Sequence, residues 1–243
     1  MLSGVPYRGE ELDLFQHATN WKRYYGTCLR PFIAGGVLEV GAGIGGTSPF
    51  LCGPRVSTWT CLEPDHTLVE RLQVSLRSSP LPVPSSVIGG TVADLEPAET
   101  FDTILYVDVL EHIQEDGAEL ARAAGRLRSG GHLIVLSPAH QWLTSPFDRA
   151  IGHCRRYSAS TLKAAGPPGL GVVRIFYLDS VGMTLSLANR VLLRNTYPTL
   201  RQIRIWDSIV IPMSRVLDPL CFNAVGKSVI GIWQKSSPAR SSL

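Results

Sequence analysis

The run from Val37 to Thr47 constrains the fold of this chain more than any other stretch. It reads VLEVGAGIGGT, with three apolar residues around one carboxylate and then four glycines within six residues. This pattern is typical of a buried strand that ends in a tight turn, because glycine serves where the backbone needs a positive φ or must approach a ligand closely. A helix beginning at Thr47 would point its first N–H groups at that ligand. The stretch therefore predicts the first strand and loop of a nucleotide-cofactor fold.

The glycines by themselves fit two kinds of cofactor. Gly41, Gly43 and Gly46 match G-x-G-x-x-G, the dinucleotide fingerprint. Glu63 lies about where that fingerprint places an acid for the ribose. Counted from Glu39, the same loop matches the pattern E-x-G-x-G. The rest of the chain has to decide between the two.

The composition predicts one globular domain. The 243 residues are enough for a sizeable core, and 44% hydrophobic residues exclude a disordered chain. A net charge of +3 is too small to indicate a nucleic-acid partner. Five cysteines without C-x-x-C spacing favour free thiols in a reducing compartment. We expect no signal peptide and no transmembrane segment, since no apolar run approaches roughly 18 residues. The predicted location is cytoplasmic.

Strands and helices alternate along the chain after an N-terminal helix. Helical spacing of apolar residues between Leu14 and Cys28 predicts that first helix. A helix at about 46–52 follows the first strand. Another follows Asp65, which can cap it, and one near 115–128 is expected to stop at Gly130 and Gly131. The predicted strands are 36–41, 58–62, 85–90, 101–107, 132–136, 172–177 and 228–233. Such alternation predicts an α/β fold with a mostly parallel sheet and helices on both faces.

We divide the single domain into four segments. They are a helical cap at 1–33, a cofactor-binding core at 34–178, a helical insertion at 179–223, and a last strand with a loose tail at 224–243. In the insertion, apolar residues form a helical stripe, with Pro212 expected to kink it. The stripe consists of Ile205, Ile209, Met213, Val216 and Leu220. We expect it to be core, with a lid role on one side.

Two other roles are open for this insertion, a dimer surface and contact with a membrane. Its basic part holds several arginines and the lone acid Asp207. The arginines are Arg190, Arg194, Arg201, Arg204 and Arg215. A basic amphipathic helix can rest on an anionic bilayer, which makes peripheral membrane contact the weaker alternative.

Five motifs in the order of the chain resemble the class I S-adenosylmethionine-dependent methyltransferases that modify small molecules, the type 11/12-like group. They are the glycine loop from Glu39 to Gly45, LEPD at 62–65, ADL at 93–95, FD…YVDVLEHI at 101–113 and LRSGGHLIV at 127–135. The resemblance implies a Rossmann-like fold with a seven-stranded, mostly parallel sheet. It also implies S-adenosylmethionine as cofactor and S-adenosylhomocysteine as product.

Acids at successive strand ends agree with that cofactor, because ligands of such sheets bind beyond the carboxyl ends of the strands. Glu39 would help to hold an ammonium group, and Glu63 would accept hydrogen bonds from both ribose hydroxyls. Asp94 would accept from the adenine amine, and Asp108 would lie near the methionine part. A pyrophosphate would be repelled by these acids. The predicted cofactor-binding set is Glu39, Gly41, Ala42, Gly43, Gly45, Glu63, Pro64, Asp94, Leu95, Asp108 and Val109.

Methyl transfer needs alignment of the reacting atoms and, for a protonated nucleophile, a base. The candidates for catalysis are His112, His140, His153 and Tyr157. No pair of histidines has a spacing typical of metal ligands, so we expect no metal.

The loop from Ser145 to Ser158 is the most polar of the chain. Its GHCRRY segment at 152–157 resembles one in a bacterial subgroup of these methyltransferases. Arg155 and Arg156 could clamp a carboxylate or phosphate of the acceptor, with Trp206 of the insertion closing over it. Alternatively, the two arginines pair with Asp148 and support the following helix.

The sequence thus predicts an enzyme that methylates oxygen, nitrogen or carbon of a small acceptor. One rival is a nicotinamide-dependent oxidoreductase, which would need a substrate domain or a Tyr-x-x-x-Lys motif that we do not find. The other is a non-catalytic protein of the same fold that binds the cofactor. The acceptor and the oligomeric state are left open.

Overall fold

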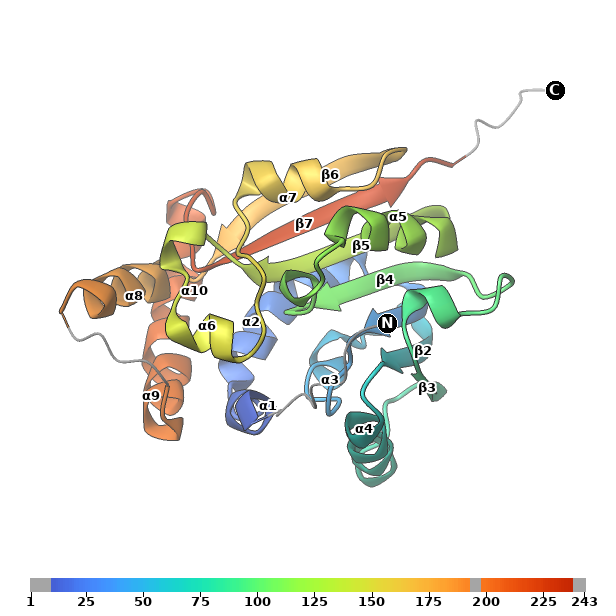
Figure 1. The fold of residues 1–243 in the computed structure, drawn as a ribbon, viewed down its shortest axis with the longest axis horizontal. Coiled ribbons are helices and arrows are strands. Elements are labelled where there is room, and N and C mark those ends of the chain that lie inside the picture. The colour runs from blue at the N-terminus through green and yellow to red at the C-terminus, as the bar shows by residue number, and fades with distance from the viewer. Residues whose placement is uncertain (1–9, 193–197, 238–243) are drawn as a thin grey trace.

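A seven-stranded sheet runs through the middle of the structure, a computed structural model that describes residues 10–192 and 198–237 (Figure 1). The strand order is β3-β2-β1-β4-β5-β7-β6. The strands are β1 (Gly35–Val40), β2 (Val56–Glu63), β3 (Ser85–Gly89), β4 (Phe101–Val107), β5 (Leu127–Pro138), β6 (Leu170–Leu178) and β7 (Ser228–Lys235). The first five pair in parallel, and β7 runs antiparallel to both β5 and β6. The predicted mostly parallel sheet is confirmed.

Helices cover both faces of the sheet, as Figure 1 shows. Their bounds are α1 (Glu10–Phe15), α2 (Thr19–Leu29), α3 (Ser48–Leu51), α4 (His66–Ser78), α5 (Asp116–Arg126), α6 (Pro146–Ala150), α7 (Ala159–Ala165), α8 (Ser180–Leu192), α9 (Leu200–Ile205) and α10 (Ile211–Leu220). Each face of the sheet has its own hydrophobic core, and successive residues of a strand point to opposite faces. Val37 packs with residues of α2 and α10, whereas Leu38 packs with residues of α5 and α7. The predicted N-terminal helix is two helices, α1 and α2.

Local sequence signals placed the start of α4 correctly. The carboxylate of Asp65 accepts hydrogen bonds from the backbone N–H groups of Thr67 and Leu68 at 2.8 and 3.1 Å. Leu72 of this helix is fully buried. A capping aspartate followed by an apolar face at helical spacing is therefore sufficient to begin the helix here.

The expected role of Gly130 and Gly131 is wrong. Helix α5 ends at Arg126, and both glycines lie within β5, where the pairing with β4 is irregular. Gly130 has a φ of 78°, and a Cβ on Gly131 would come within 2.7 Å of the Asp102 carbonyl oxygen. The glycines thus allow a bulge inside a strand, because only a residue without Cβ fits there.

The apolar stripe of the insertion is exposed, which contradicts the expectation that it is core. The exposed fractions of Ile205, Ile209, Met213, Val216 and Leu220 are 46%, 56%, 49%, 65% and 70%. A π-helical segment, η5 (Trp206–Val210), interrupts the α-helical path just before α10, whose second residue is Pro212, which has no N–H to donate. Arg194 and the side chain of Arg190 lie outside what the structure describes.

Buried aspartates fasten the other side of the insertion to the domain. The Asp207 carboxylate accepts hydrogen bonds from the backbone N–H groups of Asn20 and Trp21, at the start of α2. Asp218 accepts from the Tyr24 hydroxyl at 2.8 Å and from the Asp179 N–H at 2.7 Å. Because these bonds satisfy the acids, the side of the helices that carries Asp207 and Asp218 faces inward and the stripe faces outward.

Candidate functional site

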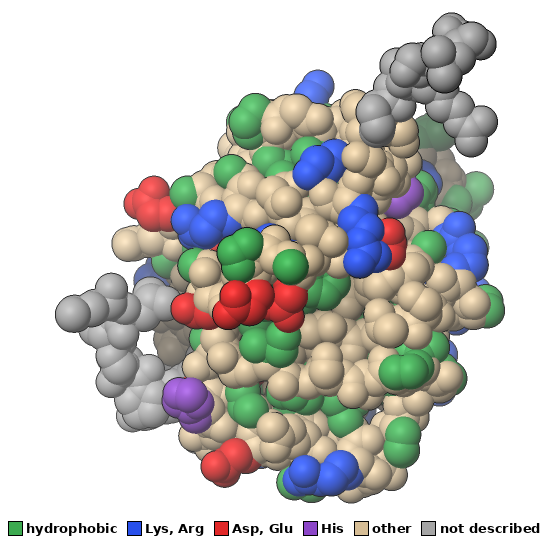
Figure 2. All heavy atoms as spheres, turned by 90° about the vertical axis from the view of Figure 1, so that its right-hand side faces the viewer, with side chains coloured by type: hydrophobic (Ala, Val, Ile, Leu, Met, Phe, Trp, Pro, Cys, Tyr) green, Lys and Arg blue, Asp and Glu red, His purple; other side chains and the backbone are tan. Residues whose placement is uncertain are grey.

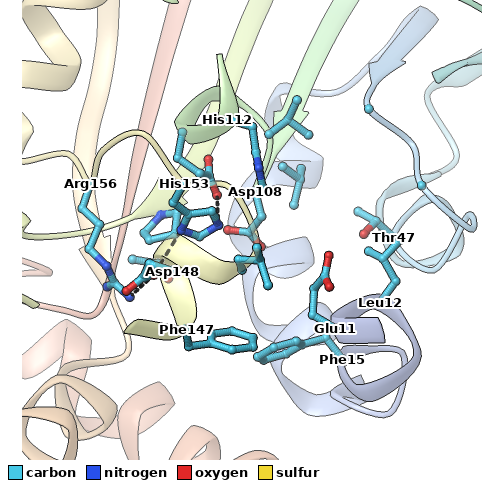
Figure 3. A pocket seen from close by; sticks show the side chains of 18 of the residues that line it. Glu11, Leu12, Phe15, Thr47, Asp108, His112, Phe147, Asp148, His153 and Arg156 are labelled. Atoms are coloured by element: carbon cyan, nitrogen blue, oxygen red, sulfur yellow. Dashed lines mark hydrogen bonds and ion pairs between the residues drawn. The ribbon is translucent and has the colours of Figure 1, made fainter. Parts of the chain in front are cut away.

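A large pocket opens where the carboxyl ends of β1, β2 and β4 meet (Figure 3). Its volume is about 1600 Å³. Its walls come from the glycine loop, α1, α2, the loop after β4, the segment 143–156 and the insertion. Ligand pockets for one small molecule span roughly 300–1,000 Å³. The cavity therefore has room for a cofactor and an acceptor together.

The glycine loop forms one end of the pocket, as the sequence predicted. Gly41, Ala42 and Gly43 line it, and Gly41 and Gly43 have φ angles of 65° and 56°. A Cβ on Gly41 would lie 2.6 Å from a methyl group of Val109, which also lines the pocket. Gly45, with a φ of 79°, turns the loop but does not line the pocket. Glycine is therefore required here both for backbone conformation and for space.

Glu63 supports this loop from the end of β2. One carboxylate oxygen accepts the Gly43 N–H at 2.8 Å, and the other accepts the Asp65 N–H at 3.1 Å. Burial raises the pKa of Glu63, while these two backbone hydrogen bonds oppose the rise. Glu63 and Pro64 line the pocket. The carboxylate thus holds the loop and presents oxygen acceptors to the cavity.

Glu39 does not line the pocket, contrary to expectation. Its carboxylate is buried and accepts hydrogen bonds from the Ser48 hydroxyl at 2.5 Å and the Trp59 indole at 2.9 Å. Burial raises its pKa to about 7, although both hydrogen bonds lower it. Because side chains alternate along a strand, Glu39 points away from the loop that follows it and holds the start of α3 instead.

Asp94 and Leu95 are also outside the pocket wall. The exposed Asp94 carboxylate accepts hydrogen bonds from the backbone N–H and the hydroxyl of Thr91, at 2.8 and 2.7 Å. Leu95 is buried in the core. The cavity is bounded here by Gly90, Thr91 and Ala93. The acid after β3 therefore closes a local turn and does not face the cavity.

Asp108 lines the pocket, with its backbone in the left-handed region at a φ of 55°. Burial raises its pKa to about 6, although nearby cations oppose the rise. One of these cations is Lys22 of α2, a lining residue that the sequence reasoning missed. Burial lowers the pKa of Lys22 to about 8 against the attraction of acids, Asp207 first. Helical spacing could have identified Lys22, because it follows the buried Ala18 by four residues and therefore lies on the same side of the helix.

A polar cluster faces Asp108 across the pocket (Figure 3). Nδ1 of His153 lies 3.1 Å from the carboxylate of Asp148, and an Arg156 nitrogen lies 2.7 Å from the same oxygen. The Ser145 hydroxyl donates to the other oxygen at 2.7 Å. Burial works against the ionised form, but the hydrogen bonds from His153 and Arg156 hold the pKa of Asp148 well below its ordinary value. We therefore assign the proton of His153 to Nδ1.

Glu111 and His112 complete this cluster. Glu111 is fully buried, and its Oε1 lies 3.8 Å from Nε2 of His153 without a hydrogen-bond partner among the described residues. Burial, and then the neighbouring Asp108, raise the pKa of Glu111 far above its ordinary value. The ring of His112 packs edge-on against that of His153, with centroids 4.6 Å apart, and burial lowers its pKa to about 4.

These three residues also have the geometry of a metal-ligand set. One ligand atom each from Glu111, His112 and His153 lies within 4.8 Å of the others. The sequence reasoning expected no metal because it considered histidine spacing alone. Glu111 and His112 lie about forty residues before His153 in the sequence. Only the tertiary structure brings these three side chains together.

The structure places two of the four catalytic candidates outside the pocket. The ring of His140 stacks on Tyr177 with centroids 5.0 Å apart. Tyr157 is buried, and its hydroxyl donates to Asp116 at 2.7 Å. Neither residue lines the cavity, whereas His112 and His153 do. Tyr157 therefore supports the core, and the structure does not bring these two candidates to the cavity.

The two adjacent arginines also separate. Arg155 lies outside the pocket wall, 2.7 Å from Asp116, and donates to the Gln114 carbonyl oxygen. Arg156 lines the pocket but is bound to Asp148. Consecutive side chains of an extended segment point to opposite sides, so the pair cannot form one clamp. The alternative, in which Asp148 is the partner, holds for Arg156.

The far end of the pocket is apolar. Phe15 of α1 and Phe147 of α6 lie opposite each other in Figure 3. Trp206 packs edge-on against Phe15, with centroids 6.3 Å apart, and its indole donates to Asp179 at 2.9 Å. Leu143 and Leu185 add to the wall. Trp206 thus lines the apolar end of the pocket, whereas the side chains of Ile209 and Met213 are exposed.

Known proteins resemble this chain in two ways. A family model described as a methyltransferase domain matches residues 16–166. A ubiquinone biosynthesis O-methyltransferase from Rhodopseudomonas palustris is 28% identical over 109 residues, 44% of this chain. That match spans 41% of the relative, or about two fifths of its length.

Solved structures share the fold at low identity. A coclaurine N-methyltransferase bound to N-methylheliamine and SAH matches with a TM-score of 0.59 and 17% identity, over 89% of this chain and 72% of that chain. The [4+2]-cyclase SpnF matches with a TM-score of 0.60 and 14% identity, over 95% of both chains. A cyclase among the matches illustrates that this fold does not by itself define the reaction.

Proposed function

The chain belongs to the methyltransferase domain family, and from that premise we propose that it transfers a methyl group from S-adenosylmethionine to a hydroxyl group of a small, largely apolar acceptor. One observation carries the proposal: the glycine loop held by Glu63 and the Asp148–His153 pair face the same cavity. The first is suited to a nucleoside and the second to removing a proton.

The cofactor end of the pocket suits a cationic nucleoside. Oε1 of Glu11, buried and lining the cavity, has no hydrogen-bond partner among the described residues, and Asp108 lies in the same cavity. Glu63 would accept hydrogen bonds from the ribose, Asp108 would attract the ammonium group, and Lys22 would bind the carboxylate. When bound, S-adenosylmethionine supplies a methyl group already activated by its sulfonium.

His153 acts as the general base in this proposal. With its proton on Nδ1, His153 takes the proton of an acceptor hydroxyl at the unprotonated Nε2. Asp148 then stabilises the resulting imidazolium, and Arg156 with Ser145 keeps Asp148 in place. A hydroxyl acceptor needs such a base, because the alkoxide or phenolate is the stronger nucleophile.

The acceptor end favours an apolar molecule over an acidic one. Of the two arginines expected to hold an acid there, Arg155 lies outside the pocket wall and Arg156 is already bound to Asp148. Phe15, Phe147 and Trp206 instead offer aromatic surface and exclude water. The O-methyltransferase among the relatives supports the same kind of acceptor. The nicotinamide alternative gains no support, since the family match is to methyltransferases.

The cytoplasm remains our proposed location. All five cysteines are free thiols, which supports a reducing compartment. Within the described ranges, no helix has the length and apolar character needed to cross a bilayer.

Calorimetry and a transfer assay test the proposal. We expect the purified chain to bind S-adenosylmethionine and S-adenosylhomocysteine and to give no heat with NAD. With labelled S-adenosylmethionine and a panel of apolar phenols and catechols, labelled methyl ethers are expected. Binding of NAD in place of S-adenosylmethionine would refute the proposed cofactor. Labelled products only from amines would refute the hydroxyl acceptor.

A further inference from the structure

The outward side of the insertion is a continuous apolar surface. We call it the outer face and define it as the exposed side chains Ile205, Ile209, Met213, Val216, Leu220 and Phe222, the last 90% exposed. From Ile205 to Leu220 the helices are continuous, so at about 1.5 Å per residue the stripe is roughly 24 Å long. Soluble monomers rarely expose such a stripe without a partner.

The charges around the outer face have one sign. Arg201, Arg204 and Arg215 are exposed on the same helices, beside the stripe. Both acids between residues 198 and 227, Asp207 and Asp218, are buried and engaged in hydrogen bonds. The described part of the insertion therefore presents apolar and positively charged groups, and no negative charge, to the outside. An anionic surface complements this pattern.

Other parts of the surface differ. On the side turned to the viewer in Figure 2, acidic and basic side chains both appear, interspersed with small apolar areas. On helix α4, the exposed Val74 stands alone among polar neighbours. The one-signed, apolar pattern is thus a property of the insertion and not of the whole protein.

The outer face adjoins the mouth of the pocket. Leu185 of α8 and Ile205 of α9 are both about half exposed and both line the cavity. Gln202, also exposed, lies on the same rim. Figure 1 shows α8, α9 and α10 together at one end of the molecule. A partner covering the outer face would therefore lie next to the entrance of the pocket.

We propose that the outer face docks the protein on the surface of a membrane rich in anionic lipids. The apolar side chains insert among the lipids, and the flanking arginines pair with phosphate headgroups. A second copy of the chain fits less well, because a symmetric contact would bring the same arginines of two protomers together. Docking does not depend on the proposed methyl transfer, since it uses none of the residues assigned to it.

Vesicle flotation of the full chain tests the proposal. We expect binding to vesicles of phosphatidylcholine mixed with phosphatidylglycerol, weaker binding to phosphatidylcholine alone, and release at high salt. The combined change Val216→Ser, Leu220→Ser and Phe222→Ser should weaken binding at least about tenfold, because these side chains supply inserted apolar area. Arg201→Gln with Arg204→Gln and Arg215→Gln should abolish the preference for the anionic vesicles.

A matched control combines Val74→Ser and Arg77→Gln on α4, which are exposed but distant from the stripe. This variant should bind vesicles like the unmodified protein. Thermal melting and cofactor calorimetry check that every variant is folded. The proposal is overturned if the chain does not float with anionic vesicles or if the serine variant floats equally well. It is also overturned if ultracentrifugation shows a dimer that the serine changes dissolve while vesicle binding is absent.

Discussion

The two ends of the pocket are built by different kinds of contact. At the proposed cofactor end, the hydrogen bond from Gly43 to Glu63 joins residues 20 apart, and Gly41 bonds to Leu62 at the end of the neighbouring strand. At the proposed acceptor end, Phe15 near the N-terminus packs against Trp206 of the insertion. The first end follows from a strand, a turn and the next strand. The second depends on how distant segments pack, so variants should affect the two ends separately.

The largest expected effect is at the acceptor end. His153→Asn should lower kcat by about 10²–10⁴-fold, because it removes the base that takes the acceptor's proton. Affinity for S-adenosylhomocysteine, measured by calorimetry, should not change. His140→Asn is the matched control, since His140 stacks on Tyr177 outside the pocket, and should retain normal turnover. A His153 variant with normal kcat would show that another group, or none, serves as base.

At the cofactor end, Glu63→Gln should act on binding. We expect roughly tenfold to hundredfold weaker affinity for S-adenosylhomocysteine, which corresponds to the loss of about 1.5–3 kcal/mol for hydrogen bonds to a charged group. The change also weakens the support of Gly43, so the loss combines both causes. Glu70→Gln on the exposed side of α4 is the control. If the two variants bind S-adenosylhomocysteine with equal affinity, Glu63 does not contact the cofactor.

The pH dependence of cofactor binding tests the role of Lys22. Burial lowers its pKa to about 8, so above this pH the free protein loses the charge that would bind the cofactor's carboxylate. Affinity should then fall with rising pH, by up to about tenfold per unit, until the pKa of the complex is reached. Between about pH 7 and pH 8 the lysine is charged and Asp108, with a pKa of about 6, is ionised, so the affinity should be level there.

Lys22→Gln is the matched variant for this test, because it removes the titrating group and keeps a hydrogen-bond donor. Titration of the cofactor's own amine affects both proteins equally, so the difference between their pH profiles reports Lys22. Methylthioadenosine lacks the carboxylate and should bind both proteins alike. Parallel pH profiles for S-adenosylhomocysteine would show that Lys22 does not contact it.

The smallest effect is expected at Arg155. Arg155→Ala removes a partly exposed ion pair with Asp116, which is worth about 0–1 kcal/mol of stability, and should leave the acceptor's KM unchanged. Arg156→Ala should lower kcat, because it releases the carboxylate that orients His153. Urea unfolding and steady-state kinetics of both variants check this. An increased KM for the acceptor in the Arg155 variant would support the original hypothesis that both arginines bind the acceptor.

Local sequence determined much of the fold. The apolar run before Gly41 predicted β1, Asp65 predicted the start of α4, and the succession of strands and helices predicted the sheet. These features depend on backbone preferences and on neighbours within a few residues, which a sequence displays directly. The same local logic placed Gly41, Gly43, Glu63 and Asp108 on the pocket wall.

Only the tertiary structure decided which side chains reach the cavity. Glu39 and Asp94 follow the sequence pattern of cofactor-binding acids, but neither lines the pocket. Glu39 accepts a hydrogen bond from the Trp59 indole, and Asp94 accepts one from Thr91 in its own turn. Arg155 and Arg156 are neighbours in sequence and point to different partners, whereas Glu111 and His153 come together from separate loops. Side-chain direction depends on the path of the whole chain, and residue identity does not encode that path locally.

The insertion shows the same division most clearly. Its sequence determined a helical stripe of apolar residues, because periodicity alone places them on one side of a helix. Which side faces inward was decided by Asn20, Trp21 and Tyr24 of a distant helix, whose donors satisfy Asp207 and Asp218. A buried carboxylate without such donors would be costly, so these contacts set the orientation and left the stripe outside.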